Sequence, residues 1–267
     1  MGASDYEFRF GGVARLYGAA ALLRLRTAHV MIVGIGGVGS WAVEALARTG
    51  IGTLTLVDLD EVCVSNVNRQ VPALDGQIGR SKVEVMSERV RAIAPDCRVI
   101  PAVEFYTELS EIRLLPESGP RPNVVIDALD AVANKVRLIA RCHRFGVPTV
   151  VCGGAGGRRD PTQVRISDLA QVTHDPLSSE VRKRLRKEYG FPRDNRPFGL
   201  DCVWSTEPPV FPQKDGTVCP GAEAAKEPGE SRRLNCDWGF GSAAFVTGAF
   251  GFAAAARAVR WVIEDVI

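Results

Sequence analysis

The sequence predicts an α/β fold: a Rossmann-like, mainly parallel sheet with helices on both faces, followed by a less regular C-terminal half. Short apolar runs rich in β-branched residues alternate with helical patterns over the first half of the chain. A glycine-rich turn follows the first of these runs, and acidic residues end two later ones. Such alternation is typical of parallel sheets. With 267 residues, 46% of them hydrophobic and 24% charged, the chain can bury a large soluble core.

The expected elements of the first half follow one another as strand, helix, strand. His29–Val33 is the first expected strand, and a helix from Ser40 to Arg48 follows it and ends at Gly50. Further strands are expected at Leu54–Val57, Arg98–Val103, Val124–Ile126 and Pro148–Cys152, and further helices at Ser81–Ala92 and Val132–Arg144. Parallel strands connected in this way place their carboxyl ends at one edge of the sheet, where ligands bind.

The second half is less regular. Strands are expected at Val164–Ile166 and Cys202–Trp204, and a helix at Ser179–Glu188. Residues 206–233 carry five prolines and are expected to form a long mobile loop, before a closing helix from about Gly241 to Ile263. We expect one domain over residues 1–267, with a nucleotide-binding half at 27–157 and a half at 158–267 that serves substrate binding and dimer formation.

Composition indicates a cytoplasmic protein. The formal net charge of +2 is too small for a generally basic nucleic-acid binder, so any RNA contact must come from a local patch. Seven widely spaced cysteines indicate a reducing compartment. Trp238–Ala256 has 19 residues without a charge, but eleven are Gly or Ala. We therefore favour a buried helix there over a membrane span.

A glycine motif suggests a nucleotide site. Gly34, Gly36 and Gly39 form G-x-G-x-x-G between a strand and a helix, where backbone N–H groups can face a phosphate. Asp58 and Asp60 end the next strand, where an acid can bind a ribose. Taken alone, this fingerprint indicates an adenine nucleotide and favours NAD over ATP.

Four later residues favour ATP instead. Asn66, Arg69, Lys82 and Asp130 all follow strands of the predicted sheet. Attack on the α-phosphate of ATP develops negative charge there and on the pyrophosphate, which Arg69 and Lys82 can neutralise with Asn66 as a further donor. Asp130 is the candidate ligand for Mg²⁺. The alternative is that Arg69 and Lys82 are solvated surface charges.

The order of these motifs resembles one superfamily. G-x-G-G-x-G, D-x-D, S/T-N-x-x-R-Q, G-x-x-K and D-x-x-D occur in that order in the ubiquitin-activating, molybdopterin- and thiamine-adenylyltransferase superfamily. The resemblance implies that Gly36 and Gly37 line the nucleotide loop and that Asp58 or Asp60 holds the ribose. It implies the triphosphate and Mg²⁺ roles given above for Asn66, Arg69, Lys82 and Asp130. Gln70 belongs to the motif, with its role open.

Further segments resemble one branch, the tRNA threonylcarbamoyladenosine dehydratases. They are residues 9–18, 34–41, 153–157, 160–163, 201–207 and 215–219, and the similarity runs from about Arg9 to Trp261. The resemblance implies a tRNA substrate that carries threonylcarbamoyladenosine, whose carboxylate is adenylated by ATP. The ureido group then closes onto the activated carbonyl. The rivals are an adenylyltransferase or sulfur-transfer component for a small sulfur-carrier protein, whose usual paired CxxC motifs this chain lacks, and a non-catalytic nucleotide-binding scaffold.

The resemblance also implies partners. A homodimer is expected, because several relatives insert an N-terminal arginine into the partner subunit's ATP site; here Gly12 stands at that position, and Arg9 and Arg15 flank it. Arg15 is the preferred candidate. A cysteine desulfurase or sulfur-acceptor protein is a further candidate partner.

Cysteines and clustered cations supply the remaining candidates. Cys202, Cys219 and Cys236 are candidates for a catalytic thiol, which cyclisation does not require. Val181–Lys187 holds five cations in seven residues, and Arg158 with Arg159 forms a smaller cluster. Both clusters are candidate RNA contacts, and the alternative for each is an ordinary solvated surface.

Overall fold

The computed structural model describes residues 3–194, 196–213, 215–220 and 240–264. Its centre is a seven-stranded sheet in the order β3-β2-β1-β4-β5-β7-β6. The strands are β1 His29–Val33, β2 Thr53–Val57, β3 Arg98–Ala102, β4 Val124–Asp127, β5 Thr149–Cys152, β6 Val164–Asp168 and β7 Asp201–Ser205. All neighbouring pairs are parallel except β6 with β7. The predicted Rossmann-like fold is confirmed.

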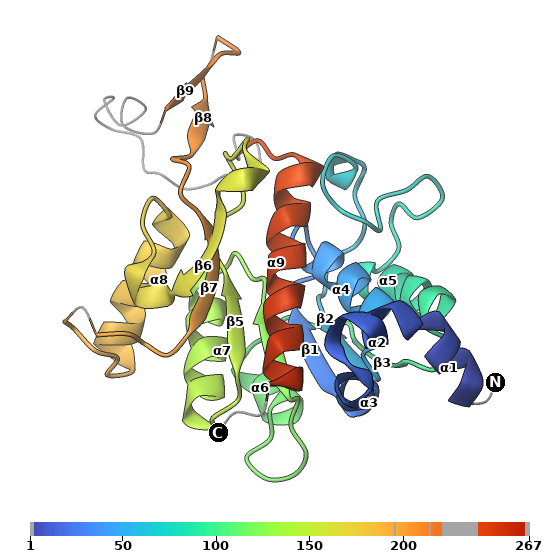
Figure 1. Ribbon diagram of the computed structural model, residues 1–267. Coiled ribbons are helices and arrows are strands. Elements are labelled where there is room, and N and C mark those ends of the chain that lie inside the picture. The colour runs from blue at the N-terminus through green and yellow to red at the C-terminus, as the bar shows by residue number, and fades with distance from the viewer. Residues whose placement is uncertain (1–2, 195, 214, 221–239, 265–267) are drawn as a thin grey trace.

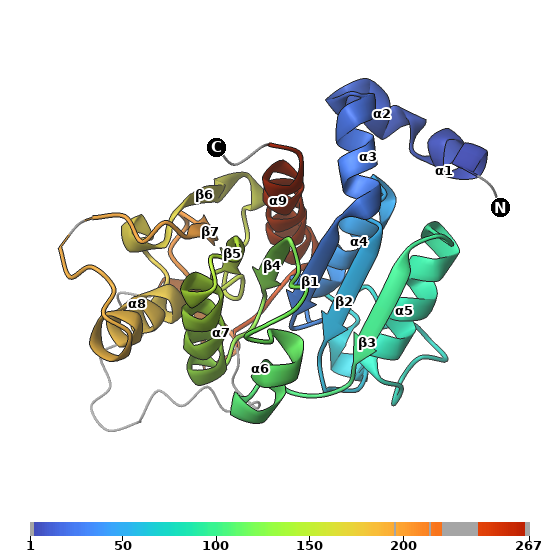
Figure 2. The ribbon, with the colours of Figure 1, turned by 90° about the horizontal axis from the view of Figure 1, so that it is seen from below.

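Helices cover both faces of this sheet (Figures 1 and 2). They are α1 Ala3–Arg9, α2 Gly11–Tyr17, α3 Ala19–Thr27, α4 Gly39–Thr49, α5 Lys82–Ile93, α6 Glu108–Leu114, α7 Val132–Arg144, α8 Pro176–Glu188 and α9 Ala244–Ile263, with 3₁₀ turns at Val64–Asn66, Pro161–Gln163 and Leu169–Gln171. Side chains alternate along β1, so that Val30 and Ile32 pack with α4, α5 and α9 while Met31 and Val33 pack with α6 and α7. The period-two pattern of one buried strand therefore supports two separate core layers.

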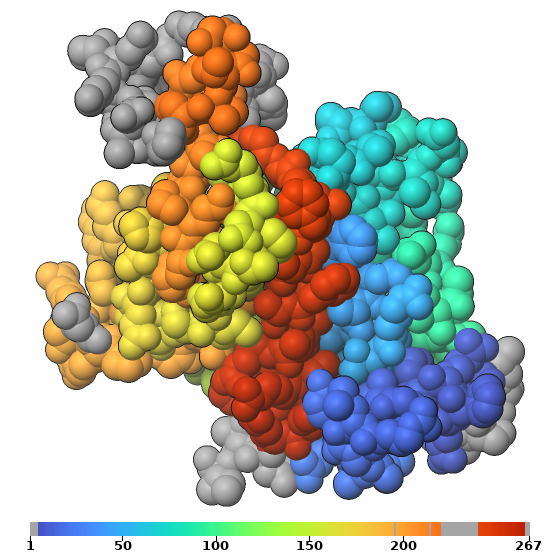
Figure 3. Space-filling view, turned by 45° about the horizontal axis from the view of Figure 1, so that its top comes forward, coloured from blue at the N-terminus to red at the C-terminus, as the bar shows by residue number. Residues whose placement is uncertain are grey.

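Helix α9 crosses the boundary between the two halves of the molecule. It contacts α4 on one side and β4, β5, β6 and β7 on the other, and Figure 3 shows it exposed along its outer face. Close approach needs glycine, because a Cβ on Gly251 would lie 2.6 Å from the Cβ of Trp41. Among the described helices, α9 alone is long and apolar enough to span a membrane, and half of that apolar stretch is buried in the protein. Its packing is that of a core helix.

Residues 206–233 are less irregular than predicted. Val210–Pro212 (β8) and Val218–Pro220 (β9) form an antiparallel ribbon with Phe211 opposite Cys219. The ribbon stands clear of the sheet in Figure 1, and the Val210 N–H donates to the Gly157 carbonyl at its base. The prediction of a loop throughout is therefore wrong for these strands. Residues 214 and 221–233 lie outside the described residues.

The N-terminal helices and α6 have no counterpart in the predicted elements. Figure 1 shows α1, α2 and α3 at the end of the sheet opposite the β8–β9 ribbon. The Tyr6 hydroxyl donates to the Gly50 carbonyl at 2.6 Å, which ties α1 to the turn after α4. Helix α2 buries none of its residues. Its Val13 and Ala14 pack against the core only in part, so the apolar periodicity of α2 is weak, which explains why the sequence pattern did not reveal it.

Candidate functional site

The carboxyl ends of β1, β2 and β4 lie side by side. Val33 is in register with Val57 of β2 and with Asp127 of β4. The chain leaves β1 toward β2 on one side, whereas β4 adds on the other side, so the strand order reverses at β1. Ligands of open α/β sheets bind at such a switch point. The structure therefore brings the glycine motif, the acids after β2 and the acids after β4 to one edge.

The glycine loop can exist only with glycines at two positions. Gly34 has φ of 92°, and a Cβ there would lie 2.7 Å from the Ala128 carbonyl oxygen. A Cβ on Gly39 would lie 1.8 Å from the Gly34 carbonyl oxygen. In the part of the chain that the structure describes, the backbone N–H groups of Gly36, Gly37 and Val38 donate to no protein acceptor. These donors, just before α4, form an anion-binding concavity.

Asp58 faces this loop. Its carboxylate accepts hydrogen bonds from the Ile35 N–H at 2.6 Å and from the Asp60 N–H at 2.8 Å. Burial raises the pKa of Asp58, and the two backbone hydrogen bonds oppose that rise. Asp58 thus fixes the shape of the loop, in addition to any ribose contact. Asp60 is exposed and pairs with Lys82.

The two predicted phosphate-binding cations differ in burial. Lys82 is only 5% exposed, at the first residue of α5, and its Nζ lies 2.8 Å from Asp60 Oδ2. It is therefore not a solvated surface charge. Arg69 is half-buried, and its Nη1 donates to the Ser65 carbonyl and to Asn68 Oδ1.

The backbone of Arg69 is held from two other elements. Its carbonyl oxygen accepts hydrogen bonds from Trp41 Nε1 of α4 at 3.0 Å and from the Thr247 hydroxyl of α9 at 3.3 Å. Thr247 and the Arg69 side chain also bound the space above Gly37, where a Cβ would meet Thr247 Cγ2 at 3.3 Å. Helices from both ends of the chain thus set the position of one predicted phosphate ligand.

The two predicted amides are buried next to these cations. Asn66 Oδ1 accepts a hydrogen bond from the Cys63 N–H at 3.1 Å, so the amide oxygen stabilises the 3₁₀ turn at Val64–Asn66. Gln70 lies beside Gly36, with its Nε2 at 4.0 Å from the position of an added Cβ. Its Oε1 is buried without a partner among the described residues. A buried, unsatisfied amide oxygen at a loop is a group that a ligand can satisfy.

After β4, the structure places one predicted residue and reveals two others. Asp130 is exposed, so its carboxylate is accessible to a ligand. Asp127 and Lys135 are both fully buried and form an ion pair at 3.1 Å. Burial raises the pKa of Asp127, while Lys135 lowers it. Lys135 was not predicted as a site residue, although its spacing of three, four and seven residues from Leu138, Ile139 and Cys142 placed it on the buried face of α7.

The edge after β5 is organised by carboxylates. Asp175 accepts hydrogen bonds from the Gly154 and Ser178 N–H groups at 2.9 and 3.0 Å. Glu207 accepts from the Arg159 and Asp160 N–H groups, both at 2.9 Å. These acceptors use donors that could otherwise bind an anion.

The prediction that Arg158 and Arg159 form an RNA-binding cluster is wrong in part. Arg158 is only 3% exposed and donates to the His174 carbonyl, while Arg159 is exposed. Burial lowers the pKa of Arg158, and the carboxylates of Asp175 and Glu207 oppose this. Arg158 is therefore enclosed by the protein, and its charge is not accessible to an RNA phosphate.

Helix α8 also presents fewer free cations than its sequence suggests. Arg182 donates to the Leu169 carbonyl, and Arg184 pairs with Glu188 through two hydrogen bonds. Lys183 and Lys187 remain exposed. Lys183 lies 3.5 Å from Glu180, a loose surface pair.

The candidate cysteines are in different environments. Cys202 is fully buried on β7, and burial raises its pKa, which disfavours the reactive thiolate. Cys219 is half-buried on β9 and accepts a hydrogen bond from Gln213 Nε2. Cys236 lies outside the described residues. The N-terminal candidates also differ: Arg9 pairs with Asp5 at 2.9 Å, and Arg15 is exposed.

Comparisons with known proteins agree with this geometry. A family model described as the ThiF family matches residues 12–265. The chain is 49% identical over 253 residues to the tRNA threonylcarbamoyladenosine dehydratase of Escherichia coli (strain K12), covering 94% of this chain and 92% of that protein.

Solved structures agree as well. The structure named TcdA (CsdL) superposes with a TM-score of 0.88 at 46% identity, over 97% of this chain and 96% of that one. The crystal structure of E. coli tRNA N6-threonylcarbamoyladenosine dehydratase, TcdA, in complex with ATP gives a TM-score of 0.84 at 43% identity, with the same coverage. The chain belongs to the ThiF family and, within it, to the tRNA threonylcarbamoyladenosine dehydratases.

Proposed function

We propose that this chain is an ATP-dependent tRNA-modifying enzyme. It adenylates the threonine carboxylate of threonylcarbamoyladenosine in tRNA and allows the ring to close to cyclic threonylcarbamoyladenosine, with release of AMP and pyrophosphate. The observation that carries the proposal is the buried Lys82 at the same sheet edge as the unpaired N–H groups of the glycine loop. A buried cation and free backbone donors at one edge suit a polyphosphate.

The protein's residues would bind ATP as a substrate. The N–H groups of Gly36 and Gly37 face phosphate oxygens, and Lys82 and Arg69 neutralise charge on the α-phosphate and the leaving pyrophosphate. In the structure Lys82 is paired with the exposed Asp60. We infer that a phosphate oxygen takes over this ammonium and leaves the Asp60 carboxylate for the ribose. Asn66 and Gln70 supply amide groups beside the same loop.

A magnesium ion would need Asp130 together with phosphate oxygens of ATP, because the described residues include no group of three or more His, Cys, Asp or Glu side chains that could hold a metal ion. Asp130 offers an exposed carboxylate one short loop away from the glycine motif, and hard oxygen ligands are those that Mg²⁺ prefers. Bound there, the ion would neutralise phosphate charge. Asp130→Ala is expected to weaken the Mg²⁺ dependence of ATP binding while the fold is kept.

Every bond that forms or breaks in the proposed reaction belongs to ATP or to the modified tRNA. A carboxylate oxygen attacks the α-phosphorus, the bond to pyrophosphate breaks, and an acyl adenylate forms. The ureido group of the same substrate then attacks the acyl carbon, and AMP leaves with the former carboxylate oxygen. Because this second nucleophile is intramolecular, the chain contributes orientation and electrostatics and needs no catalytic cysteine.

The expected setting of the enzyme is a cytoplasmic homodimer. Because α1 and α2 lie at the end of the sheet away from the glycine loop (Figure 1), Arg15 could serve an ATP site only in the partner subunit. Lys183 and Lys187 on α8 are the proposed phosphate contacts for tRNA.

Mass spectrometry of nucleosides tests this function directly. The protein is incubated with tRNA that carries threonylcarbamoyladenosine, ATP and Mg²⁺, in a buffer that preserves the labile ring. We expect the modified nucleoside to lose the mass of one water, with AMP formed in equal amount. An unchanged nucleoside despite ATP binding would refute the proposal and direct the search to small sulfur-carrier proteins or a sulfur-transfer partner such as a cysteine desulfurase.

A further inference from the structure

A buried ion pair closes the loop between β4 and α7. Lys135 Nζ lies 3.1 Å from Asp127 Oδ1, and it donates to the Asp127 carbonyl at 3.2 Å and to the Leu129 carbonyl at 3.0 Å. The Leu129 N–H donates back to Asp127 Oδ1 at 3.1 Å. One ammonium thus gathers three oxygens from a loop of a few residues, and the next residue in that loop is Asp130.

Stability alone gives little reason for this pair. Removing two charges from water is costly, and well-packed apolar residues often replace a buried ion pair without loss of stability. Helix α7 has no side-chain cap at Ala131, so the N-terminal cap does not define the path of the loop. The contacts of Lys135 with the carbonyl groups at 127 and 129 do define it.

The same loop forms a wall of the glycine motif. The Ala128 carbonyl oxygen lies 2.7 Å from the position of a Cβ on Gly34, and the Ala128 Cβ lies 3.4 Å from that of a Cβ on Gly39. Ala128 N–H also donates to the Val33 carbonyl at 2.9 Å. A displacement of residues 127–129 would therefore move the glycine loop and Asp130 together.

We infer that Asp127 and Lys135 are positioning residues that hold Asp130 and the glycine loop in the arrangement that binds ATP with Mg²⁺. The inference rests on the proposed function for the role of Asp130, but it does not depend on the tRNA substrate. Both side chains are fully buried, so neither is placed to touch a nucleotide. Their contribution is the fixed distance between the metal ligand and the phosphate-binding donors.

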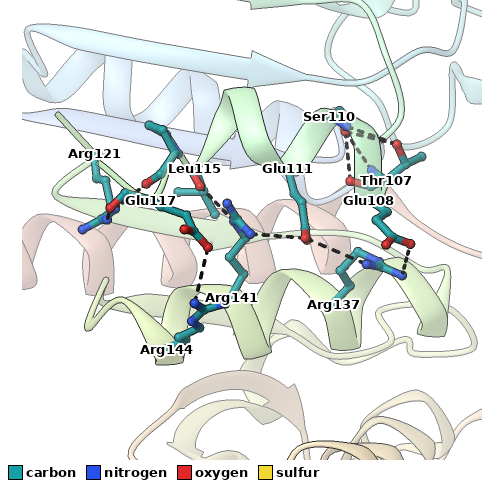
Figure 4. Close-up of polar contacts among 11 residues, drawn as sticks. Thr107, Glu108, Ser110, Glu111, Leu115, Glu117, Arg121, Arg137, Arg141 and Arg144 are labelled. Atoms are coloured by element: carbon teal, nitrogen blue, oxygen red, sulfur yellow. Dashed lines mark hydrogen bonds and ion pairs between the residues drawn. The ribbon is translucent and has the colours of Figure 1, made fainter. Parts of the chain in front are cut away.

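A second ion pair on the same helix provides the control. Arg141 of α7 pairs with Glu111 of α6 at 3.3 Å, and both side chains are largely buried. Figure 4 shows this pair within a row of contacts between α6 and α7, together with Arg137 and Arg144. Arg141 also donates to the Leu115 carbonyl. Its loss removes a partly buried cation without touching the loop after β4.

The test measures ATP binding by isothermal titration calorimetry at a series of Mg²⁺ concentrations, without tRNA. We expect Lys135→Met to raise the Mg²⁺ concentration that gives half-maximal ATP affinity by about tenfold, the usual effect of losing a group that orients a metal ligand. Arg141→Met should leave that midpoint within about twofold even where it lowers the melting temperature. A folded Lys135→Met protein with the unchanged midpoint would overturn the inference, as would ATP affinity of the unmodified chain that does not depend on Mg²⁺.

A double variant tests the inference even if the single variant Lys135→Met does not fold. Asp127→Asn with Lys135→Met removes both charges and keeps an amide oxygen for the Leu129 N–H. We expect it to fold, as judged by circular dichroism, and to show the raised Mg²⁺ midpoint; an unchanged midpoint would refute the positioning role. Because tRNA is absent, a failure of the dehydration assay with normal Mg²⁺-dependent ATP binding would count against the proposed function and leave this inference standing.

Discussion

The carboxyl edge of the sheet has two parts of opposite character. Over β1, β2 and β4, the backbone N–H groups of Gly36 and Gly37 have no acceptor among the described residues, and the buried cation Lys82 pairs only with the exposed Asp60. Over β5 and β7, Asp175 and Glu207 accept four backbone N–H groups. The first part offers backbone donors to an anion. In the second part the chain's own carboxylates accept the backbone donors, although Nε and Nη1 of the buried Arg158 have no partner among the described residues.

This difference means that one part of the sheet edge is available for nucleotide binding, while in the other part the carboxylates hold the loops of the protein in place. A polyphosphate is attracted by free donors and by cations. At the glycine loop it would meet the backbone N–H groups, and it would meet Lys82 once that ammonium leaves its pair with Asp60. The part over β5 and β7 remains rigid without a ligand, because each loop there is closed by its own acid. We expect substitutions in the first part to change ligand binding and those in the second to change stability.

The largest effect is expected from Lys82→Ala. Loss of this cation should lower the rate of ATP-dependent AMP formation by at least about 100-fold, because charge on the α-phosphate and pyrophosphate would lose its buried partner. Steady-state AMP release measures it. Arg80→Ala is the control. Arg80 lies two residues before Lys82 in the chain and forms a surface ion pair with Glu88. Comparable losses in both variants would show that Lys82 has no special role.

The next effect concerns stability. Asp175 caps α8 and the loop at Gly154, so Asp175→Ala should lower the free energy of unfolding by about 1–3 kcal/mol. Urea denaturation measures this, and ATP affinity should be unchanged. Asp160→Ala removes the cap of a short surface 3₁₀ turn and should cost less. A loss of ATP affinity in Asp175→Ala would contradict the division between the two parts.

The smallest effect is expected on tRNA binding. Lys183→Glu with Lys187→Glu should weaken tRNA affinity by about five- to tenfold at moderate salt, because two phosphate contacts become repulsive. Filter binding over a range of salt concentrations measures it, and ATP affinity should not change. Arg91→Glu reverses an exposed cation on α5 as a control. Because the double variant changes the net charge by four units and the control by two, a loss of binding free energy in Arg91→Glu half as large as that in the double variant would indicate an effect of net charge alone.

The sequence predicted the first part of the edge better than the second. The strand ends at Val33, Val57 and Ile126 followed from apolar periodicity, and the structure sets these three strands side by side. The binding roles of the residues after them stay predictions. The burial of Arg158 did not follow, because a charged pair of residues after a glycine run reads as surface until its enclosing residues are known. The ribbon was missed because prolines at its two ends and short strands resemble a loop.

The internal contacts of the site were harder to predict than its membership. Asp58 was expected at a ribose, and its contact with the Ile35 N–H depends on a turn whose geometry no spacing reveals. The burial of Lys135 shows this limit of sequence-based prediction more clearly. Its helical position was visible, but a buried ammonium becomes credible only when the three oxygens around it are known.

Helix α9 has a consequence for how the molecule assembles. It comes last among the described elements, yet it contacts α3, α4, β4 and β5, which precede residue 158, as well as β6 and β7, which follow it. The core layer on that face of the sheet includes Val246, Phe250 and Val259 of α9 and cannot close before these late residues arrive, so the chain should emerge from the ribosome with an open apolar surface. Chaperone contact during synthesis, and a single cooperative unfolding transition afterwards, both follow from this one helix.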